Sequence, residues 1–326
     1  MQERSDSQRR VAVITPAYND WACLPAFLDN LAGIADSWDQ FSVIVVDDGS
    51  SSELDPITLP DVAQFYSVEI LRLGCNLGHQ RAIAVGLAEV VNRQQFDAVV
   101  TIDVDGEDRP QDIASLLAAQ RAHPDSIVVA QRRARSEAIR FRLFYAMYKK
   151  LFYLLTGKHL DFGNFAAFSI EAAQRMVLMS ELWNHFPATV MRSKIPLIKI
   201  PLDRQPRTTG VSRMNFSALV NHGLAAIAAF IDTVFVRLIV TTIFVGSFVA
   251  FFCLAAVLVT LLTSLTISGW LTMALGFALL GLFQVLAVLI IVSFLALSAR
   301  SSISPPPSEV VRSYIDEIEL LSVQPA

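Results

Sequence analysis

Residues 98 to 108 read Ala-Val-Val-Thr-Ile-Asp-Val-Asp-Gly-Glu-Asp, an apolar run with a dense acidic end. The first five residues are apolar or β-branched, which is typical of a buried central strand. Four carboxylates then follow within six positions. Carboxylates this close raise each other's pKa unless a cation shares their charge, which favours a divalent metal with oxygen ligands. The alternative is a solvated acidic turn before a helix that Pro110 opens.

Strands and helices alternate on both sides of this stretch. The pattern predicts strands at 11–14, 41–46, 68–73, 98–102 and 127–130, and helices at about 24–31, 79–91 and 110–121. Such alternation is typical of βαβ units and a parallel sheet. Polar loops follow Ile14, Val46, Leu73 and Ile102. Because the carboxyl ends of parallel strands share one edge of a sheet, we predict an α/β domain with a ligand site at that edge.

The chain is too apolar for an ordinary soluble enzyme. Of its 326 residues, 53% are hydrophobic and only 17% are charged. No Asp, Glu, Lys or Arg occurs between Arg237 and Arg300, and a membrane-spanning helix needs only about 20 apolar residues. We predict two transmembrane helices, at about 238–262 and 271–296, joined by a short polar turn. A buried core helix is the alternative, but a helix this long and apolar all round would need a much larger domain to cover it.

The basic residues that flank the two spans predict their orientation. Arg237 precedes the first span, Arg300 follows the second, and the turn between them contains neither Lys nor Arg. Since cytoplasmic flanks carry the basic residues, we expect both termini in the cytoplasm. The expected parts are a flexible N-terminus (1–10), the α/β domain (11–215), an amphipathic juxtamembrane helix (216–237), the two spans (238–299) and a cytoplasmic tail (300–326) with a short acidic helix around 309–321.

Charge and cysteine content exclude other classes of protein. The formal net charge of −4 argues against a general nucleic-acid-binding protein. Cys23, Cys75 and Cys253 are far apart and odd in number, so they predict neither a disulfide framework nor a zinc site. We expect them to be reduced thiols.

Four short motifs resemble those of family-2 glycosyltransferases with the GT-A fold. In chain order they are Pro16-Ala17-Tyr18-Asn19, Val46-Asp47-Asp48-Gly49-Ser50, Asn76-Leu77-Gly78 and Asp103-Val104-Asp105. The resemblance covers about residues 10–237. Together with the hairpin, the chain is similar to the subgroup of dolichyl-phosphate mannose synthases and bacterial polyprenyl-phosphate glycosyltransferases. This implies a GT-A nucleotide-diphospho-sugar transferase fold, α/β with a Rossmann-like and mostly parallel sheet, followed by a two-helix transmembrane hairpin.

The resemblance also implies roles for the residues of the first two motifs. Pro16, Tyr18 and Asn19 would border the donor nucleotide. Asp47 or Asp48 would contact its base or ribose. The donor would be a nucleotide-diphospho-sugar, either a UDP- or a GDP-sugar.

The acidic motif would supply the metal centre. By the resemblance, Asp103 and Asp105 would hold Mg²⁺ or Mn²⁺ on the donor diphosphate. Glu107 stands where the family often has Gln, and it is the stronger ligand for a hard cation. Asp161 begins a segment, Asp161-Phe162-Gly163-Asn164-Phe165, that resembles the acceptor-side Gly-Asp-Phe or Gly-Asn-Phe segment of the family. Asp103, Asp105 and Asp161 are therefore the predicted catalytic carboxylates.

The cation that neutralises the donor phosphates is open in the sequence. After the turn at Gly78 the family often has Lys, whereas this chain has His79 followed by Arg81. His79 alternatively belongs only to the start of a helix, with no ligand. Arg132 opens a cationic run, Gln131 to Arg135, which would meet a diphosphate or a lipid phosphate bidentately unless it is a solvated face.

Two later segments point to a lipid acceptor. Basic and aromatic side chains alternate in residues 139–155, which suits a helix in the membrane interface; a helix packed on the sheet with a basic outer face is the competitor. The loop at 207–213 resembles the Arg-x-x-Gly-x-Ser-Lys loop of the polyprenyl-phosphate enzymes, and a surface turn is its alternative. Its Arg207, Ser212 and Arg213 would bind the donor diphosphate or the acceptor phosphate.

The predicted protein is a multi-pass glycosyltransferase, a hexosyltransferase, of the bacterial inner membrane with a cytoplasmic catalytic domain. It would transfer a sugar, with metal dependence and inversion, to a polyprenyl phosphate of the undecaprenyl or dolichyl type. The sequence leaves a homo-oligomer open. One alternative is a transferase for a hydroxyl acceptor, which would need a catalytic base such as Asp161 or Asp108. The other is a membrane scaffold without catalysis, against which the intact acids argue.

Overall fold

The computed structural model describes residues 9–34, 39–55, 59–132, 139–205, 216–263, 269–301 and 305–323. It forms two compact units. The first comprises residues 1–146, 160–229 and 305–326, and the second comprises residues 147–159 and 230–304. Most of the predicted flexible N-terminus (1–10) lies outside the described residues, and so does most of the turn between the two predicted spans.

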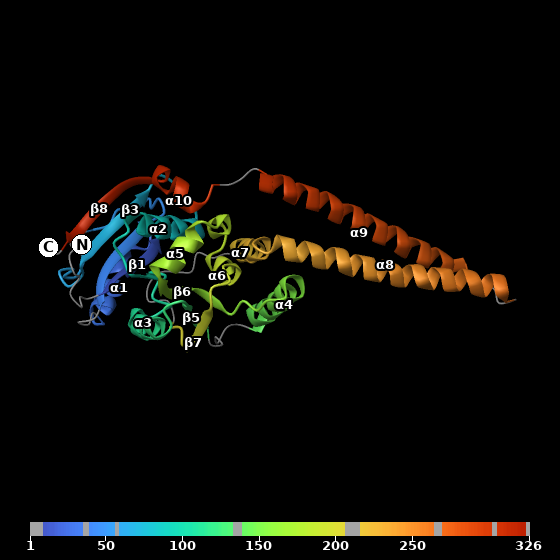
Figure 1. The fold of residues 1–326 in the computed structure, drawn as a ribbon, viewed down its shortest axis with the longest axis horizontal. Helices are drawn as coiled ribbons and strands as arrows, with labels where there is room; N and C mark the ends of the chain where they lie inside the picture. The colour runs from blue at the N-terminus through green and yellow to red at the C-terminus, as the bar shows by residue number, and fades with distance from the viewer. Residues whose placement is uncertain are drawn as a thin grey trace. The chain divides into compact units, whose positions relative to one another are not determined.

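The first unit is built on one mixed sheet (Figure 1). Its strands are β1 (Arg9–Ala17), β2 (Asp39–Asp47), β3 (Ser67–Leu73), β4 (Ala98–Thr101), β5 (Ile127–Arg132), β6 (Phe162–Ser169), β7 (Leu197–Leu202) and β8 (Ile315–Val323). Their order in the sheet is β7-β5-β6-β4-β1-β2-β3-β8. The pairs β1–β2, β1–β4, β2–β3 and β5–β7 are parallel, whereas β6 and β8 run antiparallel to their neighbours. The predicted α/β class and mostly parallel sheet are confirmed.

Helices cover both faces of this sheet. They are α1 (Leu24–Ala32), α2 (His79–Arg93), α3 (Ile113–Ala122), α5 (Ile170–Val177) and α6 (Phe186–Arg192). The unit also contains α7 (Phe216–Ala228) and the short α10 (Pro307–Val310), which packs against α2. Alternate residues of β1 point to opposite faces, so Ile14 packs with α2, α5 and α6 while Val13 packs with α1 and α3. The predicted helix at 110–121 is present as a 3₁₀ turn (Pro110–Asp112) that leads into α3.

The C-terminal segment corrects one prediction. Instead of an acidic helix around 309–321, the chain forms α10, a 3₁₀ turn (Val311–Ser313) and then β8, which pairs antiparallel with β3. Register shifts between Val68 and Glu69 and between Arg72 and Leu73 interrupt the alternation of side chains. The apolar residues of β8 therefore lack a strict period of two and resemble a helical pattern. The unpaired backbone groups along β3 decide the outcome, because a strand satisfies them and a helix does not.

The second unit contains α8 (Ile231–Leu262), α9 (Gly269–Ser301) and the C-terminal half of α4 (Ile139–Thr156). Residues 231–262 and 272–291 are long and apolar enough to cross a membrane, each with a mean hydropathy of 2.6. Large apolar side chains such as Phe244 and Leu261 are exposed along them. A helix with apolar side chains all round suits lipid on every side, and the two predicted spans agree with these helices.

The end of α4 is tied to the start of α8 within this unit. The guanidinium of Arg237 donates to the carbonyl oxygens of Tyr153 (3.4 Å) and Leu154 (3.1 Å), so it caps the last turn of α4. Exposed apolar side chains, Met147, Leu151 and Leu154, lie on the same stretch as exposed lysines.

Candidate active site

The carboxyl ends of three parallel strands bring the predicted motifs to one edge of the sheet. Ala17 at the end of β1 lies in register with Asp47 at the end of β2, and Ile14 of β1 lies in register with Thr101 of β4. The backbone N–H of Ile102 still donates to the carbonyl oxygen of Ile14 (3.1 Å), so the acidic loop leaves the sheet directly after this bond. Because these strands are parallel, the loops that carry the predicted site residues leave the sheet at this one edge.

Asp103 and Asp105 form an electrostatically coupled pair in the acidic loop. Burial and the negative charge of Asp103 raise the pKa of Asp105 to about 6, against the backbone N–H of Glu107, which donates to Oδ1 of Asp105 (3.0 Å). Asp103 Oδ1 lies 3.2 Å from Nε2 of His79 and accepts a hydrogen bond from Nδ2 of Asn164 (3.3 Å). Burial contributes most to this shift, and the charge of Asp103 adds to it a repulsion that a bound cation would relieve.

Two carboxylates form a partial donor set for a divalent ion. Within the described ranges, no three His, Cys, Asp or Glu side chains come together as a metal-binding group. Mg²⁺ is commonly held by one or two carboxylates, with substrate phosphates and water as its remaining ligands. The shared negative charge of Asp103 and Asp105 therefore fits a hard cation that a diphosphate helps to bind.

Arg204, which the sequence motifs did not predict, binds the other two carboxylates of the acidic loop. Its guanidinium contacts Glu107 (Nη1 to Oε2, 2.6 Å) and binds Asp108 through two hydrogen bonds (3.0 and 3.1 Å). Burial would lower the pKa of Arg204, but Asp108 and Glu107 raise it above its ordinary value. The carboxylate of Glu107, predicted as a metal ligand, is thus engaged by a cation of the protein. Only the return of the chain after β7 brings Arg204 here, so no local signal could have found it.

Asp48 shapes the turn that carries the third motif. Its two carboxylate oxygens accept hydrogen bonds from the backbone N–H groups of Leu77 (2.7 Å) and Gly78 (2.9 Å). Burial raises the pKa of Asp48, and these two bonds oppose that shift. Asp48 therefore joins the end of β2 to the start of α2.

Asp47 is held by a side chain of the neighbouring strand β3 and by the backbone of its own turn. Its Oδ2 contacts Arg72 of β3 (3.2 Å) and its Oδ1 accepts from the backbone N–H of Ser50 (2.9 Å). Arg72 also binds Glu319 of β8 (2.7 Å), so the C-terminal strand contributes a charge next to this motif. Gly49 has φ +69°, and a Cβ there would lie 2.8 Å from the backbone nitrogen of Asn76, so the turn requires glycine.

Asn19 links the first two motifs. Its backbone N–H donates to the hydroxyl of Ser50 (2.8 Å), and its side-chain oxygen accepts from the N–H groups of Ser51 (2.9 Å) and Ser52 (3.0 Å). Pro16 is buried within β1, whereas Tyr18 is 40% exposed in the loop. The structure thus brings the two loops predicted to border the nucleotide into one hydrogen-bonded unit.

His79 and Arg81 lie in the first turn of α2, after Gly78 with φ +93°. Burial would lower the pKa of His79, but Asp103 and Asp105 raise it above its ordinary value. His79 is half-exposed and faces the acidic pair, and Arg81 is exposed. A helix N-terminus with these side chains is suited to anions.

Asp161 lies beside the start of β6, next to two strands that end the sheet. Nζ of Lys199 (β7) and Nε2 of Gln131 (β5) each lie 2.7 Å from its carboxylate oxygens. Burial would raise the pKa of Asp161, but these two partners lower it below its ordinary value. Arg132 ends β5. Arg207, Ser212 and Arg213 lie outside the described residues.

Asn164 and Gln80 are polar residues close to Asp103 that were not among the predicted site residues. Asn164 projects from β6 between Asp103 and His79, and Nε2 of Gln80 donates to its side-chain oxygen (3.1 Å). The Gly-Asn-Phe segment could have signalled Asn164. Gln80 gives no signal of its own in the sequence, because its contacts are all distant in the chain.

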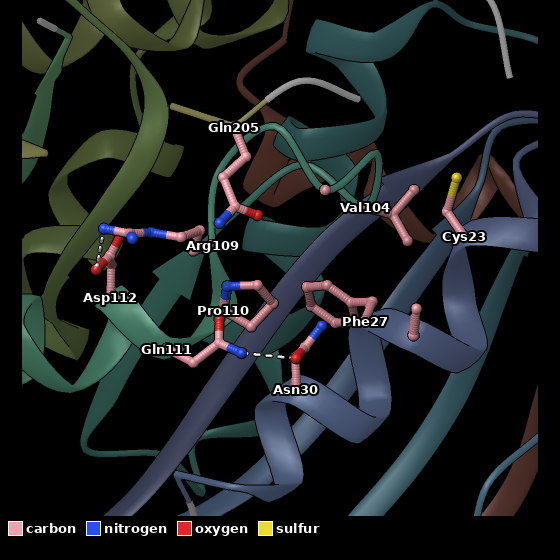
Figure 2. Close-up of a pocket in the computed structure, with 11 residues that line it drawn as sticks. Cys23, Phe27, Asn30, Val104, Arg109, Pro110, Gln111, Asp112 and Gln205 are labelled. Atoms are coloured by element: carbon pink, nitrogen blue, oxygen red, sulfur yellow. Dashed lines mark hydrogen bonds and ion pairs between the residues drawn. The ribbon is translucent and has the colours of Figure 1, made fainter. Parts of the chain in front are cut away.

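A cavity of about 410 Å³ lies beside the acidic loop, on the face covered by α1 (Figure 2). The side chain of Val104 borders it, together with Phe27 of α1 and Pro110. Nε2 of Gln111 donates to Oδ1 of Asn30 (2.6 Å) across one side of it. Arg109 and Asp112 also pair on this side of the loop (Nε to Oδ2, 3.0 Å).

The open α/β sheet has an acidic loop at its carboxyl edge, beside the two hydrogen-bonded loops that follow β1 and β2. This arrangement defines a GT-A class domain. The sequence model described as glycosyl transferase family 2 matches residues 12–177, just over half of the chain. The chain therefore belongs to glycosyl transferase family 2.

Curated relatives share the name undecaprenyl-phosphate 4-deoxy-4-formamido-L-arabinose transferase. The protein of Klebsiella pneumoniae is 27% identical over 217 residues, which cover 65% of each chain. The protein of Shewanella sediminis is 27% identical over 223 residues, which cover 65% of this chain and 63% of the relative. The chain thus spans a little under two thirds of the length of these relatives.

Solved structures support the fold. Glucosyl-3-phosphoglycerate synthase from Mycobacterium tuberculosis, in complex with Mn²⁺, UDP-glucose and phosphoglyceric acid, superposes with a TM-score of 0.51 and 16% identity. The match covers 69% of this chain and 80% of that one. At this level of identity the similarity establishes the fold alone, and it confirms the predicted GT-A class.

Proposed function

We propose that the protein transfers a sugar from a nucleotide-diphospho-sugar to a polyprenyl phosphate at the cytoplasmic face of a bacterial inner membrane. Family membership, the apolar hairpin and relatives named as undecaprenyl-phosphate transferases support this proposal. The donor would lie against the linked loops after β1 and β2, with its diphosphate toward the acidic pair.

The observation that favours a phosphate over a hydroxyl acceptor is the pairing with cations of the two carboxylates that could act as a general base. A hydroxyl acceptor must lose a proton, and Asp161 and Asp108 are the candidates. Asp161 is paired with Lys199, and Asp108 is bound bidentately by Arg204. The partners of Asp161 lower its pKa and make it a weak base, and Arg204 occupies both carboxylate oxygens of Asp108. A phosphate monoester, with a second pKa near 6, is already an anion and requires no base.

The residues of the acidic pair and their neighbours would act on the leaving group. Asp103 and Asp105 would hold Mg²⁺ or Mn²⁺, which supplies Lewis-acid stabilisation of charge on the departing diphosphate. His79 and Arg81, at the start of α2, would donate hydrogen bonds to phosphate oxygens. In-line attack by the acceptor phosphate oxygen at the anomeric carbon would give inversion and a lipid-phosphate sugar.

The second unit would hold the protein at the membrane that contains the lipid acceptor. The exposed Met147, Leu151 and Leu154 of α4 would face acyl chains while neighbouring lysines face lipid phosphates. Helices α8 and α9 would span the membrane, which makes the protein multi-pass with a cytoplasmic catalytic domain.

The test uses the purified full-length protein with UDP- and GDP-sugars and with either polyprenyl phosphate or polyprenol. Wild-type protein is expected to use the phosphate and not the alcohol. Asp103→Ala should abolish turnover while the protein remains folded, whereas Asp161→Asn should keep a substantial rate because no proton must be removed. Equal transfer to polyprenol, or loss of activity in Asp161→Asn with the fold intact, would favour the hydroxyl-acceptor enzyme instead. No transfer by the wild type to either acceptor, from any sugar of the panel, would favour the scaffold.

Arg213 provides a second test of the acceptor. If the acceptor is a lipid phosphate, the guanidinium of Arg213 clamps an anion, and a charge-assisted hydrogen bond contributes roughly 1.5 to 3 kcal/mol. Arg213→Ala should therefore lower the efficiency for polyprenyl phosphate by about one to two orders of magnitude, with a much smaller change in the KM for the donor. Arg207→Ala should act in the same direction, and Arg175→Ala on the exposed side of α5 serves as the control.

A further inference from the structure

A chain of hydrogen bonds runs from the start of α6 to the carboxylate of Asp103. The backbone N–H of Phe186 donates to Oε1 of Gln80 (2.6 Å). Nε2 of Gln80 donates to Oδ1 of Asn164 (3.1 Å), and Nδ2 of Asn164 donates to Oδ1 of Asp103 (3.3 Å). Four segments contribute one residue each: α6, α2, β6 and the loop after β4.

The groups at the two ends of this hydrogen-bonded series, the N–H of Phe186 and the carboxylate of Asp103, determine the direction of every hydrogen bond in it. A backbone N–H can only donate, so Gln80 must turn its oxygen toward Phe186 and its NH₂ group toward Asn164. Asn164 then accepts with its oxygen and presents its own NH₂ group to Asp103. An ionised carboxylate can only accept, so the last bond also has the correct polarity.

Packing holds the central residue of the chain in place. Asn164 is 8% exposed within β6, and its backbone carbonyl accepts a hydrogen bond from the hydroxyl of Thr101 in β4. Nε2 of His79 lies 2.9 Å from Nδ2 of Asn164, on the same side as Asp103. Because Asn164 is fixed at its backbone, the orientation of its amide decides what Asp103 meets.

We propose that Gln80 is a positioning residue for Asp103. By setting the amide orientation of Asn164, it orients the carboxylate that holds the divalent ion; this inference rests on the metal assignment in the proposed function. Partners that hydrogen-bond to metal-ligating carboxylates typically change metal affinity or activity by roughly 10- to 100-fold when they are mutated.

Gln80→Glu tests this role with little change in shape. The new carboxylate still accepts from the N–H of Phe186 but cannot donate to Asn164. The amide of Asn164 must then turn its NH₂ group toward position 80 and its oxygen toward Oδ1 of Asp103, where two acceptors repel each other. The added negative charge alone would tighten cation binding, so the two effects have opposite signs.

The measurement is the affinity of the full-length protein for Mn²⁺, followed by electron paramagnetic resonance of free Mn²⁺ with UDP or GDP present. We expect about tenfold weaker binding in Gln80→Glu. The matched control is Gln111→Glu, which breaks the similar bond from Gln111 to Asn30 and adds the same charge without contact to Asp103. Binding in the control should be unchanged or tighter.

A double-mutant cycle separates positioning from a general loss of structure. In an Asn164→Ala background, Gln80→Glu should no longer weaken Mn²⁺ binding, because the amide that transmits its effect is gone. Gln80→Met, which adds no charge, should weaken binding in the wild-type background, and thermal unfolding verifies that each variant is folded.

Two negative results have different meanings. In the first, the wild-type protein binds Mn²⁺ and Gln80→Glu binds it equally or more tightly. This result overturns the role of Gln80 and leaves the metal assignment in place. Wild-type protein that binds no Mn²⁺ with either nucleotide overturns the metal assignment and this inference with it.

Discussion

At the scale of single residues, the acidic loop separates its carboxylates into two groups. Asp108 and Glu107 are bound by Arg204, whereas the charges of Asp103 and Asp105 lie close together and burial raises the pKa of Asp105. His79 faces this pair, yet the pKa of Asp105 stays raised. Burial of the charged form of Asp105 therefore lowers the stability of the metal-free protein in favour of ligand binding.

Because the charged form of Asp105 is disfavoured in the folded protein, the free energy of unfolding should depend on pH. The folded pKa of Asp105, about 6, lies above its ordinary value of 3.8. Its contribution to stability is fully present below about pH 3.8 and is lost as the pH rises through about 6. In chelator at pH 8, Asp105→Asn should raise the free energy of unfolding by on the order of 2 kcal/mol, and the gain should shrink toward pH 4.5.

Thermal unfolding of the metal-free protein at the two pH values measures this difference. Asp125→Asn, at an exposed position, is the control for loss of one charge. A wild-type protein that is more stable than Asp105→Asn at pH 8 would show that the pair is neutralised from within the protein.

At the scale of elements, β8 makes the end of the chain part of the catalytic domain. It covers the edge of β3, and Glu319 binds Arg72, which holds Asp47 at the proposed nucleotide site. The ion pair itself is partly exposed and contributes little on its own. The larger effect is the pairing of the backbone of β3, which otherwise presents an open strand edge.

We predict that a protein ending at residue 304 loses stability and aggregates. Removing β8 exposes the backbone groups of β3 and leaves Arg72 without Glu319. The expected result is a lower unfolding temperature and earlier light scattering on heating. A protein that lacks only residues 324–326 is the control and should behave like the wild type. Unchanged stability without β8 would mean that the sheet does not depend on this edge strand.

At the scale of the entire chain, the polypeptide leaves the catalytic unit for two long apolar helices and then returns to the same sheet. If α8 and α9 cross a membrane as predicted, the domain before the hairpin and β8 after it lie on the same side of that membrane. This conclusion agrees with the basic flanks Arg237 and Arg300, which predict a cytoplasmic location for both.

Cysteine labelling tests this topology. A cysteine at position 268, in a variant with Cys23 and Cys253 replaced by alanine, should react with a membrane-impermeant reagent added outside the cytoplasmic membrane. Cys75 is exposed in the catalytic unit and provides the internal control, which should react only after the membrane is opened. Reaction of position 268 only from the cytoplasmic side would contradict the hairpin.

Local patterns along the chain were sufficient to predict the α/β class, the motif loops at the strand ends and the two apolar helices. The informative patterns are apolar runs that end in polar loops, and a long stretch without charge. The predictions for Asp103, Asp105 and the Gly78–His79 turn also came from local patterns, because each belongs to or follows a short motif. The strands β6 and β7 gave no comparable local signal.

The partners of these residues and the structure of the C-terminus depend on the tertiary fold. Arg204 reaches the acidic loop, Gln80 reaches Phe186, and β8 reaches β3 across separations of 96, 106 and about 250 residues. No local periodicity records such contacts, since they arise from the order of strands in the sheet and from the need to pair buried charges and backbone groups. For the same reason a segment with a helix-like pattern became a strand, because the open edge of β3 supplied hydrogen bonds that only a strand could complete.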